Sequence, residues 1–170
     1  WEVKSTTDNA IVLYYFSPDG EEGYPGNMDV TVTYELTDDN ELKIHYEATT
    51  DKPTIAGFTN HSYFNLKGAG EGTVRDHILQ LNADFHTALD DNTCPTGEVL
   101  KVDGTPYDFR EPTLIEERID NPVYASNRGL DDNWVIRRNQ PHELALAGYI
   151  YEPKSGRKME VLTTKPGVQI

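Results

Sequence analysis

Residues 59–66 bring together side chains that could do acid–base chemistry on a small polar ligand. Their sequence, TNHSYFNL, places an imidazole, hydroxyls, a phenol and carboxamides close together. If this segment is extended, His61 and Tyr63 point to the same side, because alternate side chains of a strand share a face. Carbohydrate sites combine aromatic surface with polar groups in this way. The alternative is a strand end with a satisfied core histidine inside an aromatic cluster, and the spacing fits both interpretations equally.

Two adjacent carboxylates, Asp131 and Asp132, lie in a second polar cluster at residues 127–134. In an extended segment they point to opposite sides, so one can face a ligand while the other caps the chain or forms a salt bridge. The alternative is a solvated acidic loop before a strand. A third cluster, residues 163–170, contains Pro-Gly, which indicates a turn, and Gln169 follows that turn.

The other histidines are predicted to be structural or solvated, as isolated titratable residues usually are. His45 lies on the polar side of an alternating segment, and His142 follows a proline in a turn. His77 and His86 flank a predicted strand. None of these is a candidate for catalysis.

Several chemistries have no support in the sequence. It contains no Gly-rich phosphate loop, no Cys/His set with metal-ligand spacing and no nucleophile elbow. A Ser-His-Asp triad could be assembled from Ser62 by residue type, but nothing in the sequence orients such a triad. No metal or organic cofactor is therefore expected.

The elements that must position these clusters are short strands. Apolar and polar residues alternate in residues 30–36 and 42–48, and Asp38-Asp39-Asn40 lies between them, which predicts an antiparallel hairpin with one buried face. Further strands are expected at residues 10–16, 77–82, 134–138, 144–151 and 158–164. Many short strands separated by polar turns predict an all-β sandwich.

Two stretches depart from this pattern. Residues 111–120 have a local preference for helix. Residues 87–129 are rich in Asp, Asn and Pro and poor in strand signals. A long irregular segment on a β scaffold is more often a functional loop than filler.

Composition limits the class of partner. The 170 residues carry 15 Lys and Arg against 29 Asp and Glu, a formal charge of −14, which disfavours nucleic acid and anionic membranes and suits a neutral ligand. No apolar run approaches the about 20 residues of a membrane-spanning helix. The single cysteine, Cys94, fits a reducing compartment, so a cytoplasmic location is expected.

These clusters, in this order, resemble the aldose 1-epimerase (galactose mutarotase) family over essentially the whole chain. The string at residues 59–66 matches the family's catalytic-histidine motif, and residues 17–26 resemble the lead into its central strands. Residues 129–133 correspond to the segment with a substrate-binding aspartate, and residues 163–169 to a strand and turn with a sugar-binding glutamine. The departures are Ala56-Gly57-Phe58 before the motif and Asp132 where histidine is frequent.

The resemblance implies a role for each matching residue. His61 would be the general acid that protonates the ring oxygen of the sugar, with Ser62 and Tyr63 lining the same wall. Asp131 and Gln169 would bind sugar hydroxyls. The implied partner is a free monosaccharide, and the implied reaction, interconversion of the α and β anomers, needs an acid and a base but no cofactor.

The resemblance also implies a large antiparallel β-sandwich, of which residues 1–170 would form a single domain from the central portion, incomplete at both ends. Family enzymes contribute an Asn-Arg pair and a second histidine upstream and a glutamate base downstream, so the isolated chain would lack the base. Two alternatives stay open: a non-catalytic carbohydrate-binding sandwich, and an epimerase specific for a hexose 6-phosphate, which would need a basic pocket.

Overall fold

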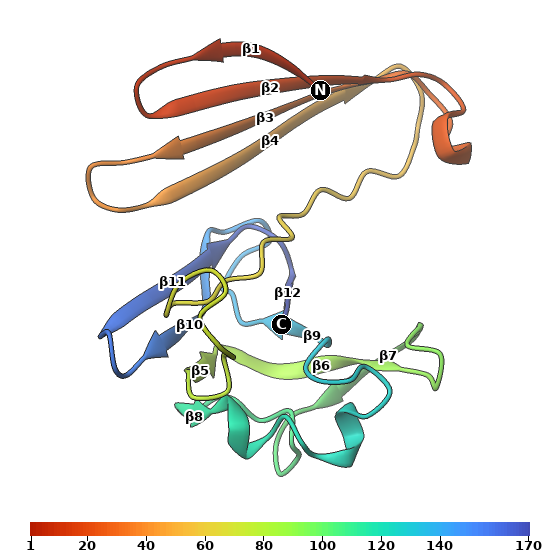
Figure 1. The fold of residues 1–170 in the computed structure, drawn as a ribbon. Coiled ribbons are helices and arrows are strands. Elements are labelled where there is room, and N and C mark those ends of the chain that lie inside the picture. Colours follow the sequence, from red (N-terminus) through yellow and green to blue (C-terminus); the bar gives the residue numbers. More distant parts are fainter. The chain divides into compact units, whose positions relative to one another are not determined.

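The computed structural model describes residues 1–170, and it is built from antiparallel strands (Figure 1). Its helices are three short 3₁₀ turns, so the prediction of an all-β antiparallel fold is confirmed. No helix has the length and apolar character needed to cross a bilayer. The chain divides into two compact units, Trp1–Ser62 and Tyr63–Ile170, called the first and second unit below.

The first unit is one four-stranded sheet in the order β1-β2-β3-β4. Its strands are β1 (Glu2–Thr6), β2 (Ala10–Ser17), β3 (Met28–Leu36) and β4 (Leu42–Thr50). The predicted hairpin is confirmed as β3–β4, which turns at Asn40 with a φ of 60°. Val30 and Val32 are buried on one face, whereas His45 is exposed on the other, so the alternation does mark one buried face.

The second unit contains two four-stranded sheets, ordered β11-β10-β5-β8 and β12-β9-β6-β7 (Figure 1). The first sheet comprises β5 (Ile78–Leu81), β8 (Thr113–Leu114), β10 (Ala145–Glu152) and β11 (Arg157–Thr163). The second comprises β6 (Ala83–Leu89), β7 (Pro95–Lys101), β9 (Asn133–Ile136) and β12 (Gly167–Gln169). Leu79 and Ala147 from one sheet and Trp134 and Ile136 from the other share one buried core, as in a sandwich.

Two sequence-based expectations about residues 87–129 were wrong. The stretch is not strand-poor, because it contains the end of β6, all of β7 and β8. Strand β7 is exposed at every residue, so it lacks the apolar alternation that would have revealed it. The expected helix at residues 111–120 is replaced by β8 and a 3₁₀ turn, because the amides of Ile115 and Glu116 donate to the carbonyls of His77 and Arg75.

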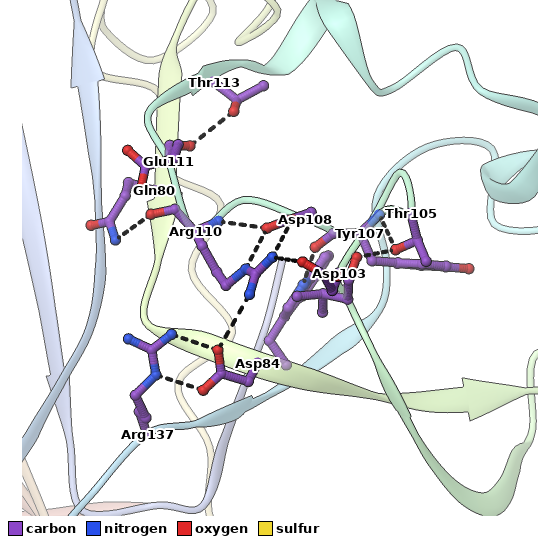
Figure 2. A network of polar contacts seen from close by, with 12 residues as sticks. Gln80, Asp84, Asp103, Thr105, Tyr107, Asp108, Arg110, Glu111, Thr113 and Arg137 are labelled. Atoms are coloured by element: carbon purple, nitrogen blue, oxygen red, sulfur yellow. Dashed lines mark hydrogen bonds and ion pairs between the residues drawn. The ribbon is translucent and has the colours of Figure 1, made fainter.

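An ion-pair network ties the loop after β7 to β6 and the residue after β9 (Figure 2). The Arg137 guanidinium donates two hydrogen bonds to Asp84, at 2.7 and 2.6 Å. Arg110 bonds both Asp108 and Asp103 and lies 3.7 Å from Asp84. These guanidinium groups lower the pKa of Asp84 and Asp108, so both carboxylates stay ionised and the scaffold around β9 is held together.

Candidate functional site

The start of β9 and the end of β12, called the β9–β12 edge below, hold the predicted site residues Asp131 and Gln169 side by side. Val168 and Gln169 pair with Trp134 and Asn133 in an antiparallel ladder. The ladder continues one step further, because Asp132 and Ile170 exchange main-chain hydrogen bonds of 3.3 and 3.2 Å. The backbone before β9 is therefore fixed against the backbone after β12.

Asp131 and Gln169 are in direct contact. The Gln169 amide nitrogen Nε2 donates a hydrogen bond of 2.6 Å to Asp131 Oδ1, and both residues are exposed. An ionised carboxylate only accepts, so the amide must present its nitrogen to Asp131 and keeps its oxygen Oε1 for another donor. Asn127 Nδ2 lies 3.3 Å from the Asp131 main-chain oxygen and supports this chain segment. The arrangement offers carboxylate and amide oxygens to ligand hydroxyl groups.

Asp132 points the other way, into the interior, with only 3% of its surface exposed. The expected alternation of the two carboxylates is therefore observed. Burial raises the pKa of Asp132, and its Oδ2 atom has no hydrogen-bond partner. Burial, with the charge of Asp132 second, also raises the pKa of Tyr107 and Tyr124. Asp132 thus lies among buried aromatic groups and not on the surface with Asp131.

Aromatic rings pack around Trp134 in β9. Trp134 is fully buried, and its indole nitrogen donates a 2.9 Å hydrogen bond to the Tyr107 carbonyl. The His86 ring stacks on Tyr107 with ring centroids 3.8 Å apart, and burial lowers the pKa of His86. His86 therefore packs as a neutral ring, in agreement with the structural role predicted for it.

Gly167 of β12 lies close to the Asn133 side chain of β9. A Cβ atom at this position would lie 2.4 Å from Asn133 Oδ1. Asn133 is in turn 3.5 Å from Thr87 Oγ1, on the neighbouring strand β6. A larger residue at position 167, two residues before Gln169 on the same strand, would therefore have to displace the Asn133 side chain.

Unlike the residues around Asp131 and Gln169, the 59–66 segment lies outside the sheets. It forms no strand, and His61, Ser62 and Tyr63 are all exposed, Tyr63 to 91%. The interpretation of this segment as a strand end within a buried aromatic cluster was therefore wrong. The Ser62 amide donates to Asn60 Oδ1 at 3.2 Å, a local bond that shapes the chain beside His61.

The division into units falls inside the 59–66 segment. His61 and Ser62 belong to the first unit, whereas Tyr63, Asp131 and Gln169 belong to the second. Among the predicted site residues, the structure shows the contact between Asp131 and Gln169.

The sequence analysis missed two groups that contact the end of the 59–66 segment. They are the imidazole of His77 and the guanidinium of Arg157, which are described below. No local signal marks either one, since both are placed by the tertiary fold.

The fold and the exposed carboxylate–carboxamide pair define a class of antiparallel β protein with a surface suited to a polar ligand. The model of the aldose 1-epimerase family matches residues 1–170, and the chain belongs to that family. It is 40% identical over 161 residues to galactose mutarotase of Pongo abelii, covering 95% of this chain and 45% of the relative. It is 34% identical over 171 residues to aldose 1-epimerase of Haemophilus influenzae, covering 100% of this chain and 49% of that protein.

A solved structure gives the same result. The crystal structure of a GalM/aldose epimerase homologue from C. elegans superposes with a TM-score of 0.86 at 30% identity, covering 98% of this chain and 49% of that one. The resemblance inferred from the sequence is therefore confirmed. The chain spans about half the length of the curated relatives it matches.

Proposed function

We propose that this chain carries part of the active site of an aldose 1-epimerase that interconverts the α and β anomers of free hexoses such as galactose or glucose. The observation that carries the proposal is the exposed Asp131–Gln169 pair, joined by a 2.6 Å hydrogen bond at the β9–β12 edge. Family membership and the name galactose mutarotase of a relative support the substrate class.

Ring opening of a hemiacetal needs one proton removed from the C1 hydroxyl and another delivered to the ring oxygen. His61 is proposed as the proton donor, because an imidazole exchanges protons near neutral pH. Rotation about the C1–C2 bond and reclosure then give the other anomer. Ser62 and Tyr63 are proposed to line the sugar beside His61.

Asp131 and Gln169 are proposed to orient the sugar. The Asp131 carboxylate would accept hydrogen bonds from ring hydroxyls, and such charge-assisted bonds are stronger than neutral ones. Gln169 already donates to Asp131, so its Oε1 would accept from a further hydroxyl. The formal charge of −14 favours an unphosphorylated hexose over a hexose 6-phosphate.

The test is exchange between the α and β anomers of galactose, followed by NMR with the complete polypeptide that contains this chain and with residues 1–170 alone. The proposal predicts acceleration by the complete polypeptide and little by the isolated residues, for which the family resemblance supplies an acid but no base. Acceleration of glucose 6-phosphate exchange alone would contradict the substrate class. Galactose binding without any acceleration would support a non-catalytic binding module.

A further inference from the structure

Both main-chain polar groups of Leu66 are held by side chains from other parts of the second unit. The Leu66 amide donates a 3.1 Å hydrogen bond to His77 Nε2, and its carbonyl accepts a 2.9 Å bond from Arg157 Nη1. His77 immediately precedes β5, and Arg157 is the first residue of β11. Leu66 is the last residue of the 59–66 segment, which has no strand ladder of its own. We call His77 and Arg157 the Leu66 clamp.

The bond from Leu66 shows which ring nitrogen of His77 is the acceptor. Nε2 accepts this bond, so a ring proton lies on Nδ1. Nδ1 faces Asp76 Oδ1 at 3.4 Å, and the Lys67 ammonium lies 2.6 Å from the same oxygen. Lys67 lowers the pKa of Asp76, so a carboxylate faces the Nδ1 side of the ring.

The His77 side of the clamp is buried and held by main-chain hydrogen bonds. His77 is fully buried, its amide donates to Val74, and its carbonyl accepts from Ile115. Without the imidazole, the half-buried Leu66 amide would lose its side-chain acceptor, which is costly for a main-chain donor.

The chain on either side of Leu66 is also held. The Lys67 amide donates to Asn65 Oδ1 at 3.0 Å, and Asn65 Nδ2 donates to the Glu71 carbonyl at 3.3 Å. Lys67 Nζ donates to the Thr73 carbonyl at 3.0 Å. A fixed point therefore lies immediately after the segment that contains His61. Five residue steps join Leu66 to His61, so a fixed Leu66 sets an outer limit of about 18 Å on the position of the His61 Cα atom.

We propose that His77 and Arg157 are positioning residues for the proton-transfer step, acting through Leu66 on the His61 imidazole. This inference rests on the proposed role of His61 as the acid. Misplacing a catalytic group by about 1 Å costs on the order of 100-fold in rate, so a loosened clamp lowers kcat while the sugar contacts of Asp131 and Gln169 persist.

The first experiment measures kcat and KM for galactose in the complete polypeptide, well below each variant's Tm. His77→Phe removes the acceptor and fills similar space, and Arg157→Met removes the donor while keeping a long side chain. Each should lower kcat by about 10- to 100-fold with little change in KM. Arg157→Lys keeps a donor and should recover part of the loss. Arg75→Met breaks an exposed ion pair with Asp120 in the same unit and is the matched control, with kcat unchanged.

The decisive measurement is a double-variant cycle. If His77 acts through His61, then His77→Phe added to His61→Asn should cause little further loss of kcat. A merely structural His77 would lose activity additively or change only the Tm, and either result would overturn the proposal. Arg157→Met with His61→Asn repeats the cycle if His77→Phe does not fold.

Amide hydrogen exchange separates this proposal from the proposed function. The Leu66 amide should exchange faster in His77→Phe than in the wild type, and unchanged exchange would refute the clamp. An inactive wild-type polypeptide would refute the proposed function and the positioning role with it. An active polypeptide with additive double variants would refute the positioning role alone.

Discussion

The two segments that carry the proposed functional residues are held in place in different ways. At the β9–β12 edge, Gln169 reaches Asp131 because a regular backbone ladder sets the register. The 59–66 segment has no ladder, and its end is held by side chains that bind the Leu66 main chain. A ladder spreads its support over many peptide groups, whereas a side-chain clamp depends on a few residues. Single substitutions away from the site should therefore affect the His61 segment more than the Asp131 edge.

The largest effect is expected at His61. His61→Asn should lower kcat by about 10²- to 10⁴-fold, the usual contribution of a general acid or base, with a much smaller change in galactose KM. Anomer exchange followed by NMR measures both constants. His45→Asn is the matched control, because His45 is exposed on the sheet of the first unit. A His61 variant that keeps most of its turnover would remove this residue from the mechanism.

The next largest effect distinguishes the two carboxylates. Asp131→Ala should lower kcat/KM by about 10- to 100-fold, since hydrogen bonds to charged groups contribute about 1.5–3 kcal/mol. Asp132→Ala should instead lower the Tm, because that side chain is buried. Steady-state kinetics and thermal denaturation of both variants make the comparison. A sugar-bound structure in which Asp132 contacts the ligand and Asp131 does not would reverse the assignment.

A smaller effect is expected from crowding the β9–β12 edge. Gly167→Ala should lower the free energy of unfolding by about 1–3 kcal/mol, as overpacking typically does, because the new Cβ meets Asn133. Urea denaturation measures this change. Gly57→Ala is the control, since a Cβ there meets no atom within 4 Å. Equal stability of the two variants would mean that the Asn133 side chain moves aside at no cost in the free energy of unfolding.

The smallest effect concerns the pH dependence of stability. The pKa of Asp132 is raised by burial in the folded state, so the unfolded chain ionises first as the pH rises and stability falls above about pH 4. Asp132→Asn keeps the shape and removes this titration. It should be more stable than the wild type at pH 7, and the difference should disappear near pH 4. Thermal denaturation at both pH values is the measurement, and a gain independent of pH would contradict the explanation.

Local periodicity determined much of the fold. The alternation in residues 30–36 and 42–48 predicts β3 and β4 and their buried face, because side chains in a strand repeat every two residues. The same rule separates Asp131 from Asp132. Strand β7 could not be found in this way, because all of its residues are exposed and no face needs apolar side chains.

Contacts between distant residues were decided by the tertiary structure alone. Gln169 meets Asp131 only because β12 pairs with β9. His77 and Arg157 meet at Leu66 although they are far apart in the sequence, one before β5 and one at the start of β11. The sequence by itself determined which residue types were present and which face of a strand each occupies. Strand pairing and register decided which of them touch, because these depend on closing long loops around a shared core and leave no local pattern.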